Sequence, residues 1–236
     1  TDDGSCLVIG STFQGGIIFY LDGNGGGLIA APTDQSTGAP WGCSGTTIGT
    51  NSGIGTGLQN TLDIVAGCTE SGTAAEICDN LTLNGYSDWY LPSKDEGLEM
   101  LVNLDALGIG DINDYYWCST EAGGNYASIE ALKVRPAGTT VSSSKWNNSN
   151  VRAIRAFGNF IMYGCTDTTA FNYNSLVNTD DGSCIAVVNG CTDATACNYD
   201  ATANVDDGSC LTIYGCTDAT ACNYDPNATC DDGSCI

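Results

Sequence analysis

Residues 190–210 read GCTDATACNYDATANVDDGSC and form the middle copy of a repeat that organises the last third of the chain. Residues 164–184 read GCTDTTAFNYNSLVNTDDGSC, and residues 215–235 read GCTDATACNYDPNATCDDGSC. Such self-similarity is typical of repeat architectures, and it predicts repeats over 163–185, 189–211 and 214–236. The chain also begins with TDDGSC, the end of another copy. We therefore expect residues 1–7 to close a truncated repeat, with more repeats upstream.

The outer cysteines of each copy predict a disulfide. They lie 19 positions apart in all three copies. A unit this small cannot bury a core of its own, and a bond closing such a loop adds about 3 kcal/mol in the loop-entropy model. The predicted pairs are Cys165–Cys184, Cys191–Cys210 and Cys216–Cys235. Fourteen cysteines, none in C-x-x-C spacing, indicate an oxidising, extracellular compartment rather than zinc or thioredoxin chemistry.

The oxygen-bearing side chains of the repeats predict calcium binding. Residues 163–236 hold eleven Asp and no Lys or Arg, so the carboxylates repel one another. Calcium takes six to eight oxygen ligands, and each copy offers five acceptors at the same positions. The predicted ligands are Asp167, Asn172, Asn174, Asp180 and Asp181; Asp193, Asn198, Asp200, Asp206 and Asp207; and Asp218, Asn223, Asp225, Asp231 and Asp232. The alternative is an acidic stalk in which these residues only cap turns.

The pattern GCTDxxAxNYxxxAxxDDGSC resembles the short calcium-binding repeats of secreted bacterial surface proteins. It is loosely similar to thrombospondin type 3 repeats, from which its spacing departs. The resemblance covers residues 1–7 and 163–236. It implies stiff, calcium-braced spacers in long adhesins.

Residues 8–160 differ in composition and predict a separate α+β domain. All six basic residues and all four tryptophans lie here. Short apolar runs around Asp22-Gly-Asn-Gly indicate a hairpin. Early strands, then helices, then later strands are typical of α+β folds. The predicted strands are Gly15–Leu21, Gly27–Ala31, Tyr115–Cys118, Tyr126–Val134 and Val151–Phe157, and the predicted helices are Leu58–Ala66, one capped by Thr73, and one capped by Ser93.

The segments NGYSDWYLPSKDE (84–96), YYWCSTE (115–121) and VRAIRAF (151–157) resemble the C-terminal domain family of bacterial collagen-like adhesins. That family is similar to C-type lectins and to the formylglycine-generating-enzyme fold. The resemblance implies a lectin-like domain, often concerned with glycans. Trp117 and Trp146 are expected in its core, and Arg152 and Arg155 are expected to pair with acids such as Asp88, Asp95 or Glu121.

The other cysteines predict further bridges. In the central domain we expect Cys43–Cys68 and Cys78–Cys118, the latter pair alternatively packing as free thiols. Within the third repeat we expect Cys222–Cys230. Cys6 and Cys197 then remain, and they either join each other, within a chain or between subunits, or stay separate, with Cys6 paired upstream and Cys197 a buried thiol.

Charge and composition exclude several classes of function. The net charge is −22 and the chain has no histidine. Nucleic acid needs basic residues to replace counterions, and no apolar run reaches the length of a membrane span. We expect no enzyme activity, since no nucleophile lies beside an evident base. The sequence instead predicts an extracellular structural or adhesive module of calcium-rigidified repeats carrying the central domain. The resemblance implies that this domain is lectin-like and gives a cell-surface or matrix glycan as its candidate partner. The alternative is a purely structural fibre subunit, a homopolymer or part of a longer parent chain, without a glycan ligand.

Overall fold

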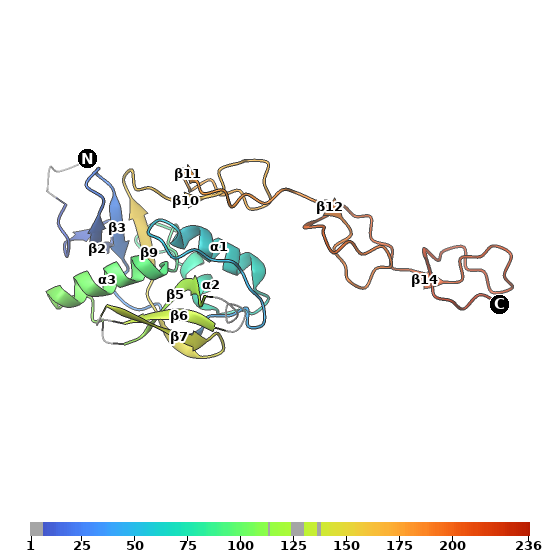
Figure 1. The fold of residues 1–236 in the computed structure, drawn as a ribbon, viewed down its shortest axis with the longest axis horizontal. Coiled ribbons are helices and arrows are strands. Elements are labelled where there is room, and N and C mark those ends of the chain that lie inside the picture. Colours follow the sequence, from blue (N-terminus) through green and yellow to red (C-terminus); the bar gives the residue numbers. More distant parts are fainter. Residues whose placement is uncertain (1–6, 113, 124–129, 136–137) are drawn as a thin grey trace. The chain divides into compact units, whose positions relative to one another are not determined.

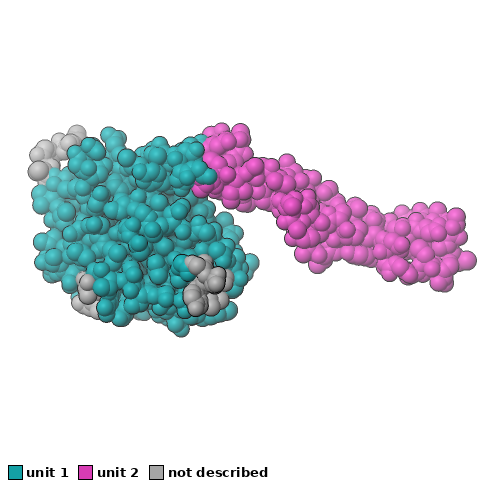
Figure 2. Space-filling model, in the orientation of Figure 1, with its two compact units in different colours: residues 1–166, 174–182 teal, residues 167–173, 183–236 magenta. Residues whose placement is uncertain are grey.

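The computed structural model describes residues 7–112, 114–123, 130–135 and 138–236 of the chain. It divides into two compact units, one formed by residues 1–166 and 174–182 and the other by residues 167–173 and 183–236 (Figure 2). The second and third repeats therefore lie wholly in the second unit. The first repeat is shared between the two units, whereas the sequence placed a boundary before it.

The first unit is mixed α and β, as predicted, and its strands form two main sheets (Figure 1). The first sheet is antiparallel, in the order β1 (Thr12–Phe13), β2 (Gly16–Leu21), β3 (Gly27–Ala30) and β9 (Ile154–Phe157). The second has the order β4 (Ser36–Pro40), β8 (Asn148–Val151), β5 (Tyr116–Glu121), β6 (Glu130–Arg135) and β7 (Thr139–Ser144). Its β5 and β8 pair in parallel, while its other neighbours are antiparallel.

The predicted hairpin at Asp22 is confirmed. Asp22 N donates to Gly26 O at 3.0 Å and closes the turn between β2 and β3. The Asp22 carboxylate accepts from the backbone N–H groups of Asn24 and Gly26 at 2.7 and 2.9 Å. A short acidic side chain that satisfies backbone donors in this way stabilises a tight turn.

Three helices lie within the described residues: α1 (Gly57–Gly67), α2 (Ala74–Asp79) and α3 (Lys94–Leu107). Ser93 caps α3 in a full capping box with Glu96, as predicted. Thr73 caps α2 by accepting from Glu76 N, and the Glu76 carboxylate accepts from Gly72 N. The apolar face of α3 packs against β2 of one sheet and β5 and β6 of the other. It therefore lies between the two sheets, as Figure 1 shows.

The core consists of two clusters of buried side chains. One contains Trp41, Trp89 and Trp117, and the other contains Tyr90, Tyr116 and the buried face of α3. The prediction that Trp146 lies in the core is wrong, because its side chain is 71% exposed. Its neighbour Lys145 points inward instead and contacts Trp41, with Nζ 4.4 Å from the ring centroid.

The strand predicted over Val151–Phe157 is two strands in different sheets. β8 ends at Val151, and β9 begins at Ile154. Between them the buried Arg152 guanidinium binds Asp34 at 2.6 Å and donates to the carbonyls of Ala31 and Gly110. These contacts turn the chain from one sheet to the other. Of the strand predicted over Tyr126–Val134, residues 126–129 lie outside the described part.

Each repeat contains one short parallel pairing that brings its beginning beside its end. The paired strands are β10 (Tyr163–Gly164) with β11 (Thr179–Asp180), β12 (Asn189–Gly190) with β13 (Val205–Asp206), and β14 (Tyr214–Gly215) with β15 (Cys230–Asp231). The rest of each repeat consists of turns. Across the described residues, no helix combines the length and the apolar character needed to cross a membrane.

Candidate functional site: the repeats and the bond between them

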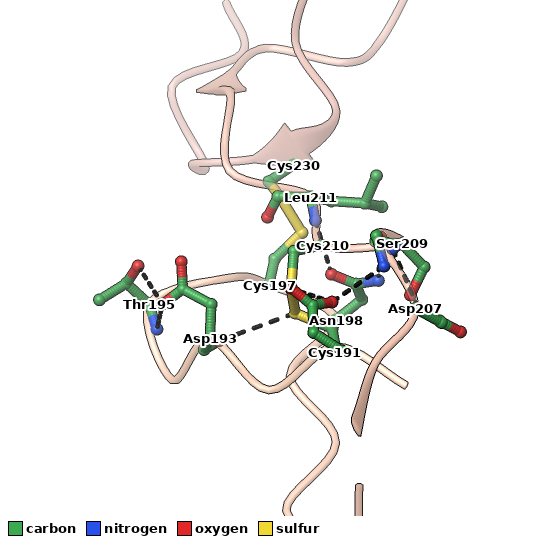
Figure 3. Close-up of a disulfide and its surroundings, with 12 residues drawn as sticks. Cys191, Asp193, Thr195, Cys197, Asn198, Asp207, Ser209, Cys210, Leu211 and Cys230 are labelled. Carbon is green, nitrogen blue, oxygen red and sulfur yellow. Dashed lines mark hydrogen bonds between the residues drawn. A yellow bond between two sulfur atoms is a disulfide. The ribbon is translucent and has the colours of Figure 1, made fainter. Parts of the chain in front are cut away.

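An asparagine clamp holds each repeat to the segment that leaves it. In the second repeat, Asn198 Nδ2 donates to Ser209 O at 2.7 Å, and Asn198 Oδ1 accepts from Leu211 N at 2.8 Å (Figure 3). The equivalent side chains, Asn172 and Asn223, make the same pair of bonds. Both ends of the amide are thus committed to the backbone. Because the position needs one hydrogen-bond donor and one acceptor, the repeat carries Asn here and not Asp.

A second clamp, which sequence reasoning missed, holds the segment that enters the repeat. Asn204 Oδ1 accepts from Val188 N at 2.8 Å, and Asn204 Nδ2 donates to Ala186 O at 2.9 Å. Asn178 does the same for Met162 and Phe160 in the first repeat. The shared Asn at this position in two copies was the available signal.

The aspartates form Asx turns. Asp193 Oδ1 accepts from the backbone N–H and hydroxyl of Thr195 at 2.8 and 2.7 Å (Figure 3). The same arrangement recurs at Asp218 with Thr220. Hydrogen bonds from a Thr or Ser two residues later favour the ionised carboxylate. They lower the pKa of six aspartates: Asp167, Asp193, Asp200, Asp207, Asp218 and Asp232.

The other predicted calcium ligands also have local roles. Asp180, Asp206 and Asp231 each accept from the glycine N–H two residues later, and these glycines have φ near +77°. Asn174 and Asp225 accept from backbone N–H groups two residues later. At Asp181 the backbone N–H donates to Gly164 O. Turn capping, the alternative to calcium, thus accounts for most of the recurring acceptors, and calcium itself stays a prediction.

The disulfides that close the repeats agree with the sequence prediction. Cys191–Cys210 and Cys216–Cys235 are formed, each with a sequence separation of 19. Cys165 and Cys184 are both disulfide-bonded. In the central domain, Cys43–Cys68 is confirmed.

The second and third repeats are joined by a bond that the sequence analysis did not predict. Cys197 of the second repeat forms a disulfide with Cys230 of the third, and their Cα atoms lie 6.0 Å apart (Figure 3). Leu211, the last residue of the second repeat, accepts at its carbonyl from Cys197 N at 3.1 Å. Tyr214 of the third repeat donates its hydroxyl to Thr195 O at 2.7 Å. A covalent bond and a hydrogen bond therefore connect neighbouring repeats.

This bond overturns two predictions. Cys222–Cys230 is wrong, because Cys230 pairs with Cys197 and Cys222 is an exposed free thiol. Cys6–Cys197 is wrong for the same reason, while Cys6 itself lies outside the described residues. The error came from assigning the extra cysteines within one repeat, although their positions serve the junction between two.

The predicted Cys78–Cys118 disulfide is also wrong. Both residues are buried free thiols. Cys78 packs in the tryptophan-containing cluster and Cys118 in the other one, which confirms the alternative that the two pack as free thiols. Cys118 Sγ donates to Leu132 O at 3.1 Å. Burial raises the pKa of the Cys118 thiol to about 12, which keeps it protonated and unreactive.

The basic side chains of the first unit are largely neutralised within the fold. Arg155 pairs with Asp88, as predicted, and Arg152 pairs with Asp34. Glu121 binds Lys145 at 2.6 Å, not an arginine. These ion pairs leave little positive surface for a polyanion.

One group of three potential metal ligands lies close together among the described residues. Atoms of Cys43, Cys68 and Glu70 fall within 4.8 Å of one another. Because the two cysteines are joined to each other, they offer no thiolate to a metal. This group is therefore a disulfide beside a carboxylate.

A cavity of about 240 Å³ lies in the first unit. Its lining includes the Asp88–Arg155 ion pair and the rings of Tyr90, Phe157 and Phe160. Such a mixture of aromatic faces and fixed polar groups is typical of small-ligand sites. A scan against protein-family models and a search of curated proteins found no match to this chain.

Proposed function

We propose that this chain is a non-enzymatic, extracellular structural module in which the repeats act as a spacer. The Cys197–Cys230 bond is the observation that carries the proposal. A repeat of about 20 residues is too small to bury a core of its own, so a spacer made from such repeats needs other connections. A covalent bond between neighbours limits their relative motion and resists unfolding under load.

The composition of the repeats supports the same role. Their surface is acidic, and eleven aspartates without a basic residue keep such a segment from collapsing onto itself. The asparagine clamps hold the entry and exit segments of the second repeat through Asn204 and Asn198. The direction of the chain is thereby set at both ends of the repeat.

The test is whether the second and third repeats move as one body. Backbone ¹⁵N relaxation of the full chain would be compared with that of the C197S/C230S variant. We expect one common tumbling time for the two repeats, and separate times in the variant. C222S is the matched control, because it removes a thiol outside the bond. Independent motion of the two repeats in the unaltered chain would reject the spacer function.

An adhesive role for the lectin-like first unit is the second candidate, and the cavity beside Arg155 favours it. A sugar hydroxyl at this cavity would hydrogen-bond to the Asp88–Arg155 ion pair. Saturation-transfer NMR against a panel of monosaccharides tests it. The signal should weaken in R155K, and R135K is the control because Arg135 does not line the cavity. Absence of any signal would favour the purely structural fibre subunit.

Calcium bracing is a further part of the proposal. The clamping amides are engaged with backbone groups, so the carboxylates are the better candidate ligands. Neutralising mutually repelling aspartates would stabilise the folded repeats, and a ligand that binds only the folded state raises stability by mass action.

A further inference from the structure

Cys197 joins the second repeat to the third, and the third repeat has a cysteine, Cys222, at the equivalent position. Cys197 stands six positions after Cys191, and Cys222 stands six positions after Cys216. Cys197 is bonded to Cys230, which stands 14 positions after the first cysteine of the next repeat. Cys222, by contrast, is an exposed free thiol. The two equivalent positions thus differ in whether the cysteine is bonded.

The backbone around Cys222 makes the same hydrogen bonds as the backbone around the disulfide-bonded Cys197. Cys222 N donates to Ile236 O at 2.8 Å, as Cys197 N donates to Leu211 O at 3.1 Å. Asn223 Oδ1 accepts from Ile236 N at 2.9 Å, matching the clamp on Leu211. The surface that receives the next repeat is therefore built the same way in both copies.

We propose that Cys222 is the attachment point for another repeat of this pattern, one that carries a cysteine 14 positions after its first. The partner's tyrosine, two positions before that first cysteine, would donate to Thr220 O, as Tyr214 donates to Thr195 O. Two thiols lose two electrons and two protons to form the bond, and a disulfide oxidant such as oxidised glutathione is reduced to two thiols.

A second copy of this chain does not fit as the partner. Its Cys230 is already bonded to Cys197. The equivalent positions of its other repeats are Val205 and Thr179, which form no disulfide. The partner must therefore contribute a repeat of the third repeat's type with that cysteine unpaired.

The inference rests on the proposed spacer function and is tested on an extended chain. A copy of residues 212–236 is added after Ile236, which restores the spacing found between the second and third repeats. After oxidation with glutathione disulfide, peptide mapping without reduction should find Cys222 bonded to the added cysteine at the position of Cys230. The matched control carries valine there, as the second repeat does, and should leave Cys222 open to alkylation.

An alkylatable Cys222 in the extended chain, or a Cys222–Cys222 dimer, would overturn the inference. Closure of the added repeat's outer disulfide shows that it has folded. If that repeat does not fold, peptide mapping of the native material tests the inference instead. Cys222 should be found there in a disulfide with a repeat-type peptide, and a free Cys222 thiol would refute the inference. Common tumbling of the second and third repeats, with Cys222 still free, would reject this inference and leave the spacer function standing.

Discussion

Cys197 and Cys230 are 33 residues apart in the sequence and bonded to each other, each in a different repeat. The disulfides Cys43–Cys68, Cys191–Cys210 and Cys216–Cys235 join cysteines only 25, 19 and 19 residues apart. The longer bond links two repeats that are each already closed by a disulfide of their own. Disulfides therefore close each of these repeats and also connect one to the next.

The free thiols should differ sharply in reactivity. Cys222 is exposed, whereas Cys78 and Cys118 are buried, and burial raises the pKa of both buried thiols. We expect iodoacetamide at pH 8 to alkylate Cys222 in the folded, isolated 236-residue chain within minutes, and the other two only after unfolding. Mass spectrometry of tryptic peptides measures this. Rapid native labelling of Cys118 would contradict the packed core described for it.

Replacing Asn198 by aspartate should weaken the second repeat. The carboxylate still accepts from Leu211 N but loses the donor to Ser209 O, leaving two acceptors facing each other. The cost is about 1–2 kcal/mol. Hydrogen exchange at Leu211 N should accelerate about tenfold, while Y199F serves as the neighbouring control. If Asn198 binds calcium instead, the N198D variant would be more stable than the unaltered chain when calcium is present.

Stability should depend on pH through Glu96. Burial raises its pKa from 4.5 to about 7, against the opposing effect of backbone hydrogen bonds from Ser93, Gly55 and Gly57. Between these values the folded protein holds a proton that the unfolded chain has lost. The contribution of Glu96 is therefore fully present below pH 4.5 and is lost as pH rises through 7, by about 3 kcal/mol.

Two measurements check the behaviour of Glu96. Its carboxyl ¹³C shift should titrate near pH 7. In E96Q the chain should be less stable, because the amide turns a donor toward backbone N–H groups, but this pH-dependent loss should disappear. A Glu96 titration near pH 4 would show that the backbone donors outweigh burial.

Removing calcium should destabilise the repeats if their carboxylates bind it. We expect calorimetry of the full chain in EDTA to lower the melting temperature of the transition assigned to the repeats. Magnesium at equal ionic strength is the control for general screening. The same melting temperature with EDTA, calcium and magnesium would rule out specific binding and leave the Asx turns as the complete role of the aspartates.

Local signals in the sequence were sufficient for much of the fold. The Asp22 turn, the Ser93 capping box and the outer cysteines of the repeats each act over a few residues or in a repeated register. Such features depend on short-range sterics and hydrogen bonding, which the sequence displays directly. The position of Arg152 between two sheets was different, because its partners, Asp34 and Gly110, come from distant parts of the chain.

The sequence by itself determined that the repeats exist and which cysteines close the second and third of them. Only the tertiary structure decided which cysteines join one repeat to the next and that Cys78 and Cys118 stay apart. The physical reason is that a disulfide requires two Cα atoms within about 7 Å. The number of residues between two cysteines does not reveal the distance between their Cα atoms when the bond joins two separately folded repeats.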